Sequence, residues 1–309
     1  MLVIYKTTPD GLKKIQQFEK DCWVYMIDPV KEELDRVREL GVPLDFLTDP
    51  LDIDERSRLE AEDGVILSVL RVPIFEGDEA DIPFTTVPLG IIFVKEMIVT
   101  ISRKETIILS DFLEGKEKNF STSKRNYFLF SVYLKTALLY LRYLKDINKK
   151  TSAIEDELQL SLKNEELIKL FNMEKSLVYF MTALKTDELM IERLQRTNYI
   201  KLDQDDNELL EDVTVEYKQA IEMANVYSNI LSGMMDAFAS VISNNLNVVL
   251  KFLTSVTIIL MIPTLVASIY GMNIQLPFQN SPSAFLITMI ISFGLSIIGI
   301  IIFRKLKWF

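Results

Sequence analysis

The 309-residue sequence contains no histidine and only one cysteine, Cys22. Histidine is the usual general base near neutral pH and, together with cysteine, the usual ligand of transition metals. These absences exclude Ser-His-Asp hydrolases, zinc fingers, histidine kinases and proteins that hold haem through histidine. A single thiol also excludes disulfide bonds within the chain. Oxygen atoms are then almost the only metal ligands available, and they suit Mg²⁺ far better than Zn²⁺.

A long part of the sequence lacks charge. The chain carries 34 basic and 44 acidic side chains, for a net charge of −10, yet none lies between Phe252 and Phe303, a run of 52 residues. This run divides into two apolar segments, 252–270 and 284–303. About 20 helical residues cross a bilayer core of about 30 Å. We therefore predict two transmembrane helices, because the alternative, a core hairpin of a soluble protein, would need a very large domain around it.

The residues that flank these segments predict their orientation. Lys251 precedes the first segment, a basic tail (304–309) follows the second, and the loop between them (271–283) has no charge. Lys and Arg are retained on the cytoplasmic side, so we expect a multi-pass cell-membrane protein with both termini in the cytoplasm. The N-terminus has no apolar stretch long enough for a cleaved signal. Trp308 and Phe309 fit the interfacial preference of aromatic side chains.

Proline and glycine divide the cytosolic region. No proline occurs between Leu89 and Ile262, and Gly233 is the only glycine between Gly115 and Gly271. Before about residue 115, short β-rich runs alternate with turn residues and one charged helical stretch, which predicts a small α/β domain. The expected strands include 2–5, 22–27, 65–72, 87–94 and 97–102, and the expected helix is 31–40.

Three long helical stretches are predicted after this domain, at about 120–160, 164–196 and 206–270. The expected fold is an α+β cytosolic domain followed by long stalk helices and two C-terminal transmembrane helices. Its segments are the N-terminal α/β domain (1–115), a helical region (116–205), a stalk helix (206–251), the first span (252–270), the outer loop (271–283), the second span (284–303) and the basic tail (304–309).

The last helical stretch continues from the stalk into the first span, interrupted only by Pro263. About 63 residues at 1.5 Å each would make a rod of about 95 Å, which favours a bundled stalk. Along its membrane half, a set of mostly polar residues recurs at alternating steps of three and four, so its members share one face of the helix. This polar stripe consists of Asn247, Leu250, Thr254, Thr257, Met261, Thr264 and Ser268. Either its hydroxyls hold helices together, or several copies of the chain place it around an axis as a pore lining, which requires an oligomer.

The first span ends in Tyr270, Gly271, Met272 and Asn273. A glycine after a helix is by itself ordinary capping chemistry. However, YGMN at the end of a long stalk-and-span helix, followed by a second span and the tail RKLKWF, resembles the CorA family of magnesium channels, whose signature is Gly-Met-Asn. A looser match covers the stretch at 51–60.

The resemblance implies a funnel-shaped homopentamer, with the pore lined by the first span and Gly271, Met272 and Asn273 as its outer, cation-selecting ring. Aligned without gaps, the family's pore positions fall on Asn247, Leu250, Leu253, Met261, Thr264 and Asn273. Among these, Leu250, Leu253 and Met261 would form the hydrophobic constriction. Because Mg²⁺ prefers oxygen ligands and loses water reluctantly, Asn273 oxygens and Gly271 carbonyls would hold it through its waters. Magnesium uptake driven by the membrane potential is expected, with no organic cofactor.

Three features differ from the family pattern. Ile274 stands where an aromatic residue often follows the motif, Pro263 lies one position later than usual, and the outer loop lacks the usual acidic residue. The choice among Mg²⁺, Co²⁺ and Ni²⁺ therefore stays open, as does membership in a zinc-transporting branch of the superfamily.

Acidic residues of the cytosolic region are candidates for regulation. Seven acids and no basic residue lie between Lys201 and Lys218. Most fit a solvated face and a helix N-terminus. The resemblance also implies a regulatory Mg²⁺ site between subunits that closes the channel, with its stalk acid at Asp212 and a further acid at Asp236. Its partner is expected among Glu76, Asp78, Glu79 and Asp81.

Basic residues would ring the cytosolic mouth of such a pentamer: Lys251, Arg304, Lys305 and Lys307. Retention of topology explains them, and a positive collar would also raise the barrier for a cation. A rival interpretation is a two-span sensor or scaffold whose stalk signals to a cytosolic partner, which leaves the polar stripe and YGMN unexplained. The sequence has no nucleophile–base pair, phosphate-binding loop or metal-ligand cluster, so we expect neither an enzyme nor a nucleic-acid-binding protein.

Overall fold

The computed structural model describes residues 1–309 except 118–119, 161–163, 198, 279 and 309. Phe309, expected at the membrane interface, thus lies outside the described residues. The chain forms two compact units, Met1–Gly233 and Met234–Phe309. Helix α6 (Gln204–Tyr270) contributes to both of them.

The first unit contains a seven-stranded sheet with the order β2-β1-β3-β7-β6-β5-β4. Its strands are β1 (Leu2–Thr8), β2 (Gly11–Ile15), β3 (Cys22–Ile27), β4 (Arg58–Glu62), β5 (Val65–Phe75), β6 (Phe84–Val94) and β7 (Met97–Ser102). Only β3 and β7 pair in parallel within the described sheet. All five expected strands are present. The two that the sequence analysis missed, β2 and β4, form the edges of the sheet and are rich in Lys, Arg and Glu, a composition that lowers β-propensity and protects an edge from further pairing.

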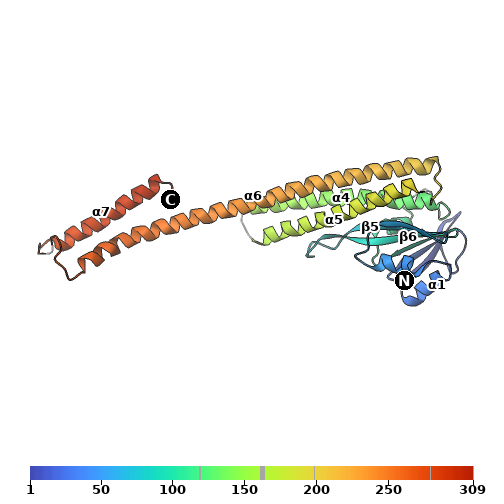
Figure 1. Cartoon of the computed structure of the whole chain (residues 1–309), viewed down its shortest axis with the longest axis horizontal. Helices are drawn as coiled ribbons and strands as arrows, with labels where there is room; N and C mark the ends of the chain where they lie inside the picture. Colours follow the sequence, from blue (N-terminus) through green and yellow to red (C-terminus); the bar gives the residue numbers. More distant parts are fainter. Residues whose placement is uncertain (118–119, 161–163, 198, 279, 309) are drawn as a thin grey trace. The chain divides into compact units, whose positions relative to one another are not determined.

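Helices cover both faces of this sheet. The shorter helical elements of the first unit are α1 (Lys31–Arg38), α2 (Leu44–Thr48), η1 (Asp49–Leu51) and α3 (Ile107–Leu113). Val37, Phe46 and Leu47 from α1 and α2 close a core over one face. The long helices α4 (Arg125–Leu160) and α5 (Asn164–Arg196) contact β5 and β6, and they lie on the opposite side of the sheet from α1 (Figure 1).

Gly90 of β6 is required by the close approach of η1. A Cβ atom at this position would lie 2.6 Å from the ring Cγ of Pro50 and 2.8 Å from Cγ2 of Ile101. Real Cβ contacts are longer, so a side chain would push apart the sheet and the turn that carries Pro50. This packing fixes the segment that leads into β4.

Helix α6 begins with a capping box. Oδ1 of Asp203 accepts a hydrogen bond from the backbone N–H of Asp206 at 2.8 Å, and Oδ2 of Asp206 accepts one from the N–H of Asp203 at 3.3 Å. Asp206 also accepts a hydrogen bond from Nδ2 of Asn126, at 2.7 Å. Two of the seven acids between Lys201 and Lys218 therefore stabilise a helix N-terminus, as the sequence analysis expected of most of them.

In the first unit α6 packs antiparallel to α5. Its buried apolar positions recur at steps of three, four or seven residues, at Leu210, Val213, Tyr217, Ala220, Ala224 and Leu231. Hydrogen bonds join Thr214 to Gln195 at 3.1 Å, Tyr217 to Asp187 at 3.4 Å and Ser232 to Glu174 at 3.1 Å. The repeat is that of a coiled-coil seam.

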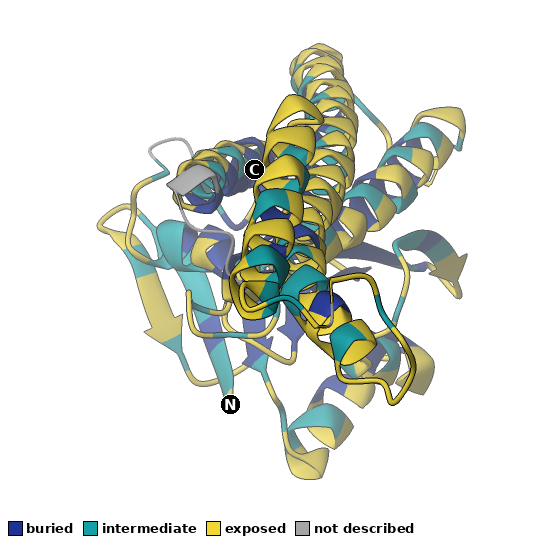
Figure 2. Cartoon of the chain, turned by 90° about the vertical axis from the view of Figure 1, so that its left-hand side faces the viewer, coloured by how far each residue is buried: buried dark blue, intermediate teal, exposed yellow. Residues whose placement is uncertain are grey.

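The second unit consists of the end of α6 and helix α7 (Ala284–Lys305). Both helices are long and apolar enough to cross a membrane, with mean hydropathies of 2.2 and 2.7 over their most apolar windows. Most of their residues in this unit are exposed, as Figure 2 shows in yellow. The structure thus has the expected α+β domain, long helices and two C-terminal apolar helices.

Candidate functional site

Within the second unit, α6 and α7 meet along a seam of small and aliphatic residues. Ser292 and Ser296 of α7 are buried, as are Ser255 and Val266 of α6. An ideal Cβ at Gly299 of α7 would lie 3.4 Å from Cδ1 of Ile262 and 3.8 Å from Cγ1 of Ile259. Small residues at such positions let two membrane helices approach. On α6, the seam face is therefore defined by Ser255, Ile259, Ile262 and Val266.

The polar stripe lies on the opposite face of α6. Residues two positions apart on an α-helix are separated by about 200°. Thr257, Met261, Thr264 and Ser268 each follow a seam residue by two positions. Every member of the stripe, and Leu253 beside it, is exposed in the single chain. The stripe therefore does not hold α6 against α7 of its own chain, which removes one form of the helix-glue interpretation.

Hydroxyl groups of the stripe present oxygen acceptors outward. Oγ1 of Thr257 donates to the carbonyl of Leu253 at 2.8 Å, and Oγ1 of Thr264 donates to that of Leu260 at 3.4 Å. Each hydroxyl proton is thus occupied within the helix, while the oxygen lone pairs remain available to outside donors. Waters around a cation are donors of this kind.

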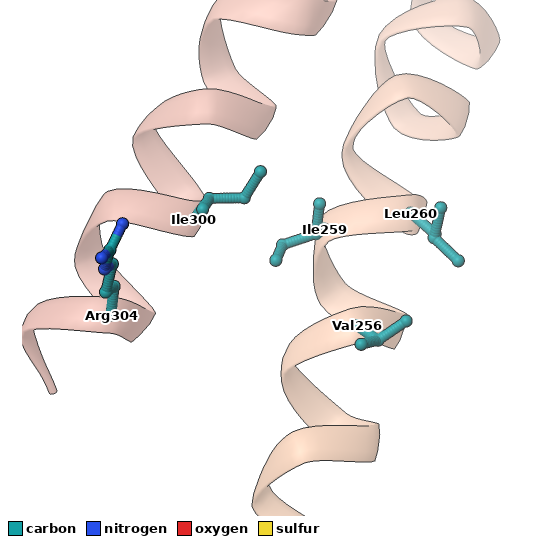
Figure 3. Close-up of a pocket in the computed structure, with 5 residues that line it drawn as sticks. All are labelled: Val256, Ile259, Leu260, Ile300 and Arg304. Carbon is teal, nitrogen blue, oxygen red and sulfur yellow. The ribbon is translucent and has the colours of Figure 1, made fainter. Parts of the chain in front are cut away.

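An apolar pocket opens between the two helices beside the seam. It has a volume of about 440 Å³ and is lined by Val256, Ile259, Leu260, Ile300 and Arg304 (Figure 3). Ile259 and Ile300 point toward one another across it, and Arg304 lies at its end near the chain terminus. The pocket is part of the exposed apolar surface of α6 and α7, which needs lipid or another copy to cover it.

The Gly-Met-Asn motif follows the last turn of α6. The N–H of Gly271 bonds to the carbonyl of Ala267 at 2.9 Å, and the N–H of Met272 bonds to that of Ile269 at 3.2 Å. Gly271 does not adopt the left-handed conformation of a glycine cap, and the nearest atom to an ideal Cβ there is the Ala267 carbonyl at 3.3 Å. A side chain here would therefore contact the backbone of the last helical turn closely. Met272 and Asn273 are exposed.

The acids proposed for regulation have different surroundings. Glu76 forms an ion pair with Lys104 at 2.5 Å. Asp78 pairs with Lys150, whose ammonium also lies over the rings of two phenylalanines. Asp212 is an exposed residue of the first unit, and Asp236 is an exposed residue of the second. Over the residues that the structure describes, no three or more Asp, Glu or Cys side chains gather as a metal site within one chain. Glu79 and Asp81 are exposed.

Comparison with known proteins places these features in one family. The family model described as "CorA-like Mg2+ transporter protein" matches residues 19–305. The chain belongs to the CorA family. It is 28% identical to the cobalt/magnesium transport protein CorA of Methanocaldococcus jannaschii over an alignment of 296 residues. The alignment covers 93% of this chain and 90% of that protein. It is also 27% identical over 184 residues to the magnesium transport protein CorA of Helicobacter pylori, covering 58% and 56% of the two chains.

Solved structures of CorA proteins and of more distant proteins share the fold. The complete CorA magnesium transporter of Methanocaldococcus jannaschii matches with a TM-score of 0.85 at 26% identity, covering 100% of this chain and 99% of that one. Full-length CmaX matches with a TM-score of 0.73 at 15% identity, covering 99% and 97%, which shows the fold alone. CorA family members are transporters in membranes, in agreement with the two apolar helices.

The basic tail of this CorA protein folds back at the end of α7. Lys307 has a positive φ of 56°. Its N–H bonds to the carbonyl of Arg304 at 3.2 Å, and the N–H of Trp308 bonds to that of Phe303 at 3.0 Å. The Trp308 ring stacks on Phe303, with centroids 5.4 Å apart. These two bonds and the apolar contact form a Schellman motif, which fixes an exposed cluster of cationic side chains at the helix end: Arg304, Lys305 and Lys307.

Sequence reasoning missed the fully buried acid Asp187. It lies on the buried face of α5 together with apolar residues spaced by three and four: Leu177, Phe180, Leu184, Ile191 and Leu194. A lone carboxylate in such an apolar heptad is a signal that can be read from the sequence.

Proposed function

We propose that this chain assembles as a homopentameric magnesium channel of the cell membrane, with both termini in the cytoplasm. Its spans are 252–270 and 284–303, and the polar stripe of α6 lines the ion path. The observation that carries this proposal is the position of the stripe, exposed on the side of α6 that faces away from α7. Polar residues of a membrane helix face protein or water, and several copies of the chain around an axis would place the stripe against both.

The chemistry of the path fits a hydrated divalent cation. The stripe offers hydroxyl and amide oxygens without a carboxylate, so an ion that keeps its water shell is held weakly enough to leave. Gly271, Met272 and Asn273 form the outer ring, where a glycine lets five copies approach one ion closely. Leu250, Leu253 and Met261 form the constriction that closes by dewetting. A divalent cation falling through about 100 mV gains about 4.6 kcal/mol, which drives uptake without ATP.

Cytosolic Mg²⁺ closes the channel in this proposal. Asp212 of one copy and the loop acids Glu76 and Asp78 of the next would share the regulatory ion, with Asp236 nearer the membrane as a further acid. In the single chain Glu76 and Asp78 form salt bridges with Lys104 and Lys150. Mg²⁺ must compete with these lysines for the carboxylates, which sets the Mg²⁺ concentration at which the site fills. The exposed cations Lys251, Arg304, Lys305 and Lys307 form a collar at the mouth.

Magnesium flux into vesicles tests the proposal. Purified protein is reconstituted with a magnesium-sensitive dye inside, and a negative internal potential is applied. Wild-type protein should pass Mg²⁺, and Asn273→Ala should lose most of the flux. Asn280→Ala is the matched control, since it removes an exposed asparagine from the same loop outside the motif. Protein that passes no Mg²⁺, or an Asn273→Ala variant as active as Asn280→Ala, would refute the proposal and favour the sensor or scaffold.

Cobalt is the second ion to compare, because the relative from Methanocaldococcus jannaschii is named a cobalt/magnesium transport protein. Flux of Co²⁺ in the same vesicles would show whether the outer loop, which has no acidic residue, discriminates between the two ions.

A further inference from the structure

The carboxylate of Asp187 connects three parts of the first unit. Its side chain is completely buried on α5. It accepts hydrogen bonds from the Ser57 hydroxyl, from the backbone N–H of Arg71 on β5 at 3.0 Å and from the Tyr217 hydroxyl on α6 at 3.4 Å. All three donors are uncharged. A buried carboxylate with such partners keeps a large part of its desolvation penalty when it is ionised.

The other polar groups around Asp187 are occupied elsewhere. The Arg71 guanidinium donates to Thr86 at 2.9 Å and to the carbonyl of Glu55 at 2.6 Å rather than to the carboxylate. On α4, the Tyr140 hydroxyl donates to the carbonyl of Arg71 at 2.9 Å. Tyr133, also on α4, bonds to Ser68 of β5.

These neighbours leave one group that titrates near neutral pH. The charged and titratable groups facing Asp187 are Arg71 from β5, Tyr133 and Tyr140 from α4, and Tyr217 from α6. Burial raises the pKa of all three tyrosines above the ordinary value, and arginine keeps its charge at any physiological pH. Burial also raises the pKa of Asp187, to about 7, against the hydrogen bonds and the Arg71 charge, which lower it.

We propose that Asp187 is a positioning residue, a proton-sensitive joint that sets how firmly α6 is held against α5 and the sheet. As a neutral acid it fits the buried site, and α6 stays in place. When it releases its proton to the cytosol, the buried charge is stabilised only if water enters or the packing around Tyr217 loosens. Because α6 is one helix from Gln204 to Tyr270, the joint acts on the helix that carries the polar stripe. This consequence for transport rests on the proposed function.

Hydrogen exchange of the backbone amides at 210–224 tests the joint without any transport. Wild-type protein and Asp187→Asn, which is neutral at every pH, are compared at pH 6 and pH 8. Dividing the exchange rate of the wild type by that of the variant at each pH removes the chemical dependence of exchange on pH. Because the effect of ionising Asp187 already begins near pH 4, the wild type should exchange faster than the variant at both pH values, and the ratio of their exchange rates should be about tenfold larger at pH 8 than at pH 6. A ratio that is the same at both pH values would overturn the proposal.

Two tyrosine variants provide a second test that survives if Asp187→Asn fails to fold. Tyr217→Phe removes a donor from the carboxylate and should move the midpoint of the exchange change to higher pH. Tyr140→Phe removes a buried hydroxyl that bonds to the Arg71 carbonyl instead, and it should leave the midpoint in place. Equal midpoints in the two variants would contradict the joint.

Flux measurements at internal pH 6 and pH 8 test the connection to transport. Wild-type flux should rise with pH, and flux through Asp187→Asn should not. A wild-type flux that is equal at both pH values would overturn the coupling to the pore. Vesicles that pass no Mg²⁺ at either pH would instead refute the proposed function, while the exchange data still decide the joint.

Discussion

Replacing Asp187 by asparagine should remove a pH dependence from the stability of the first unit. In the folded protein burial raises the pKa of this carboxyl from 3.8 to about 7. The folded state therefore binds more protons than the unfolded state between about pH 4 and pH 7, and the free energy of unfolding falls as pH rises through that window. Below pH 4 both states are protonated and the stability from this residue is fully present.

The size of the effect follows from the shift. A difference of about three pKa units at 1.36 kcal/mol each gives about 4 kcal/mol, lost between about pH 4 and pH 7. For a unit of this size that corresponds to a fall of about 10 °C in Tm. The asparagine variant, neutral throughout, should not show this loss.

Thermal unfolding of both proteins in detergent, followed by circular dichroism at unit steps from pH 4 to pH 8, measures the difference directly. Other titrating groups are common to the two proteins and cancel in the comparison. The difference in Tm should grow up to about pH 7 and then stay constant. A difference that is independent of pH would show that Asp187 is ionised throughout in the folded protein and would refute the reasoning.

Three further changes have definite expected outcomes. Gly90→Ala should lower the free energy of unfolding by about 1–3 kcal/mol in denaturant titrations, because its Cβ would overlap a proline ring, whereas Gly233→Ala, with no atom within 4 Å of its Cβ, should raise it by about 0.5–1 kcal/mol; equal effects would contradict the packing of β6. Thr264→Val removes an oxygen from the polar stripe and should reduce magnesium flux about 2–10-fold, from one lost hydrogen bond of about 0.5–1.5 kcal/mol. Thr288→Val, which removes the same kind of hydroxyl from α7, should leave flux unchanged, and a loss as large as that of Thr264→Val would count against the stripe as the ion path. Lys307→Gly should raise the stability of the α7 end by about 1 kcal/mol, since it removes the cost of a left-handed side-chain-bearing residue, and slower hydrogen exchange of the tail amides would measure it.

The long elements could be predicted because their signals are continuous. The absence of proline between Leu89 and Ile262 and the scarcity of glycine after Gly115 predict three helices, and the structure has them at Arg125–Leu160, Asn164–Arg196 and Gln204–Tyr270. Short or polar elements gave no such signal. β2 and β4 are charged because they are edge strands, and α2 and α3 are too short to show a helical period.

The candidate site was only partly predictable. Periodicity assigns the polar stripe to one face of α6, but which face meets α7 depends on the packing of Ile262 against Gly299, residues joined only through the loop. Likewise, the sequence shows Glu76 and Asp78 as acids but not their partners, since Lys104 lies 28 residues away and Lys150 lies 72. Whether Asp212 meets these acids in a neighbouring copy stays a prediction.

By itself the sequence determined the chemistry that this protein has available: oxygen ligands in place of imidazole and thiolate, a charge-free pair of spans, and a Gly-Met-Asn motif at the end of a long helix. These are properties of residue types and their order, which folding does not alter. Tertiary structure alone decided which side of α6 faces away from its own chain and where Asp187 is buried. The donors to Asp187 at Ser57 and Arg71 lie 130 and 116 residues from it. Contacts over such distances, and the pKa that they and burial create, exist only once the sheet, α5 and α6 have packed together.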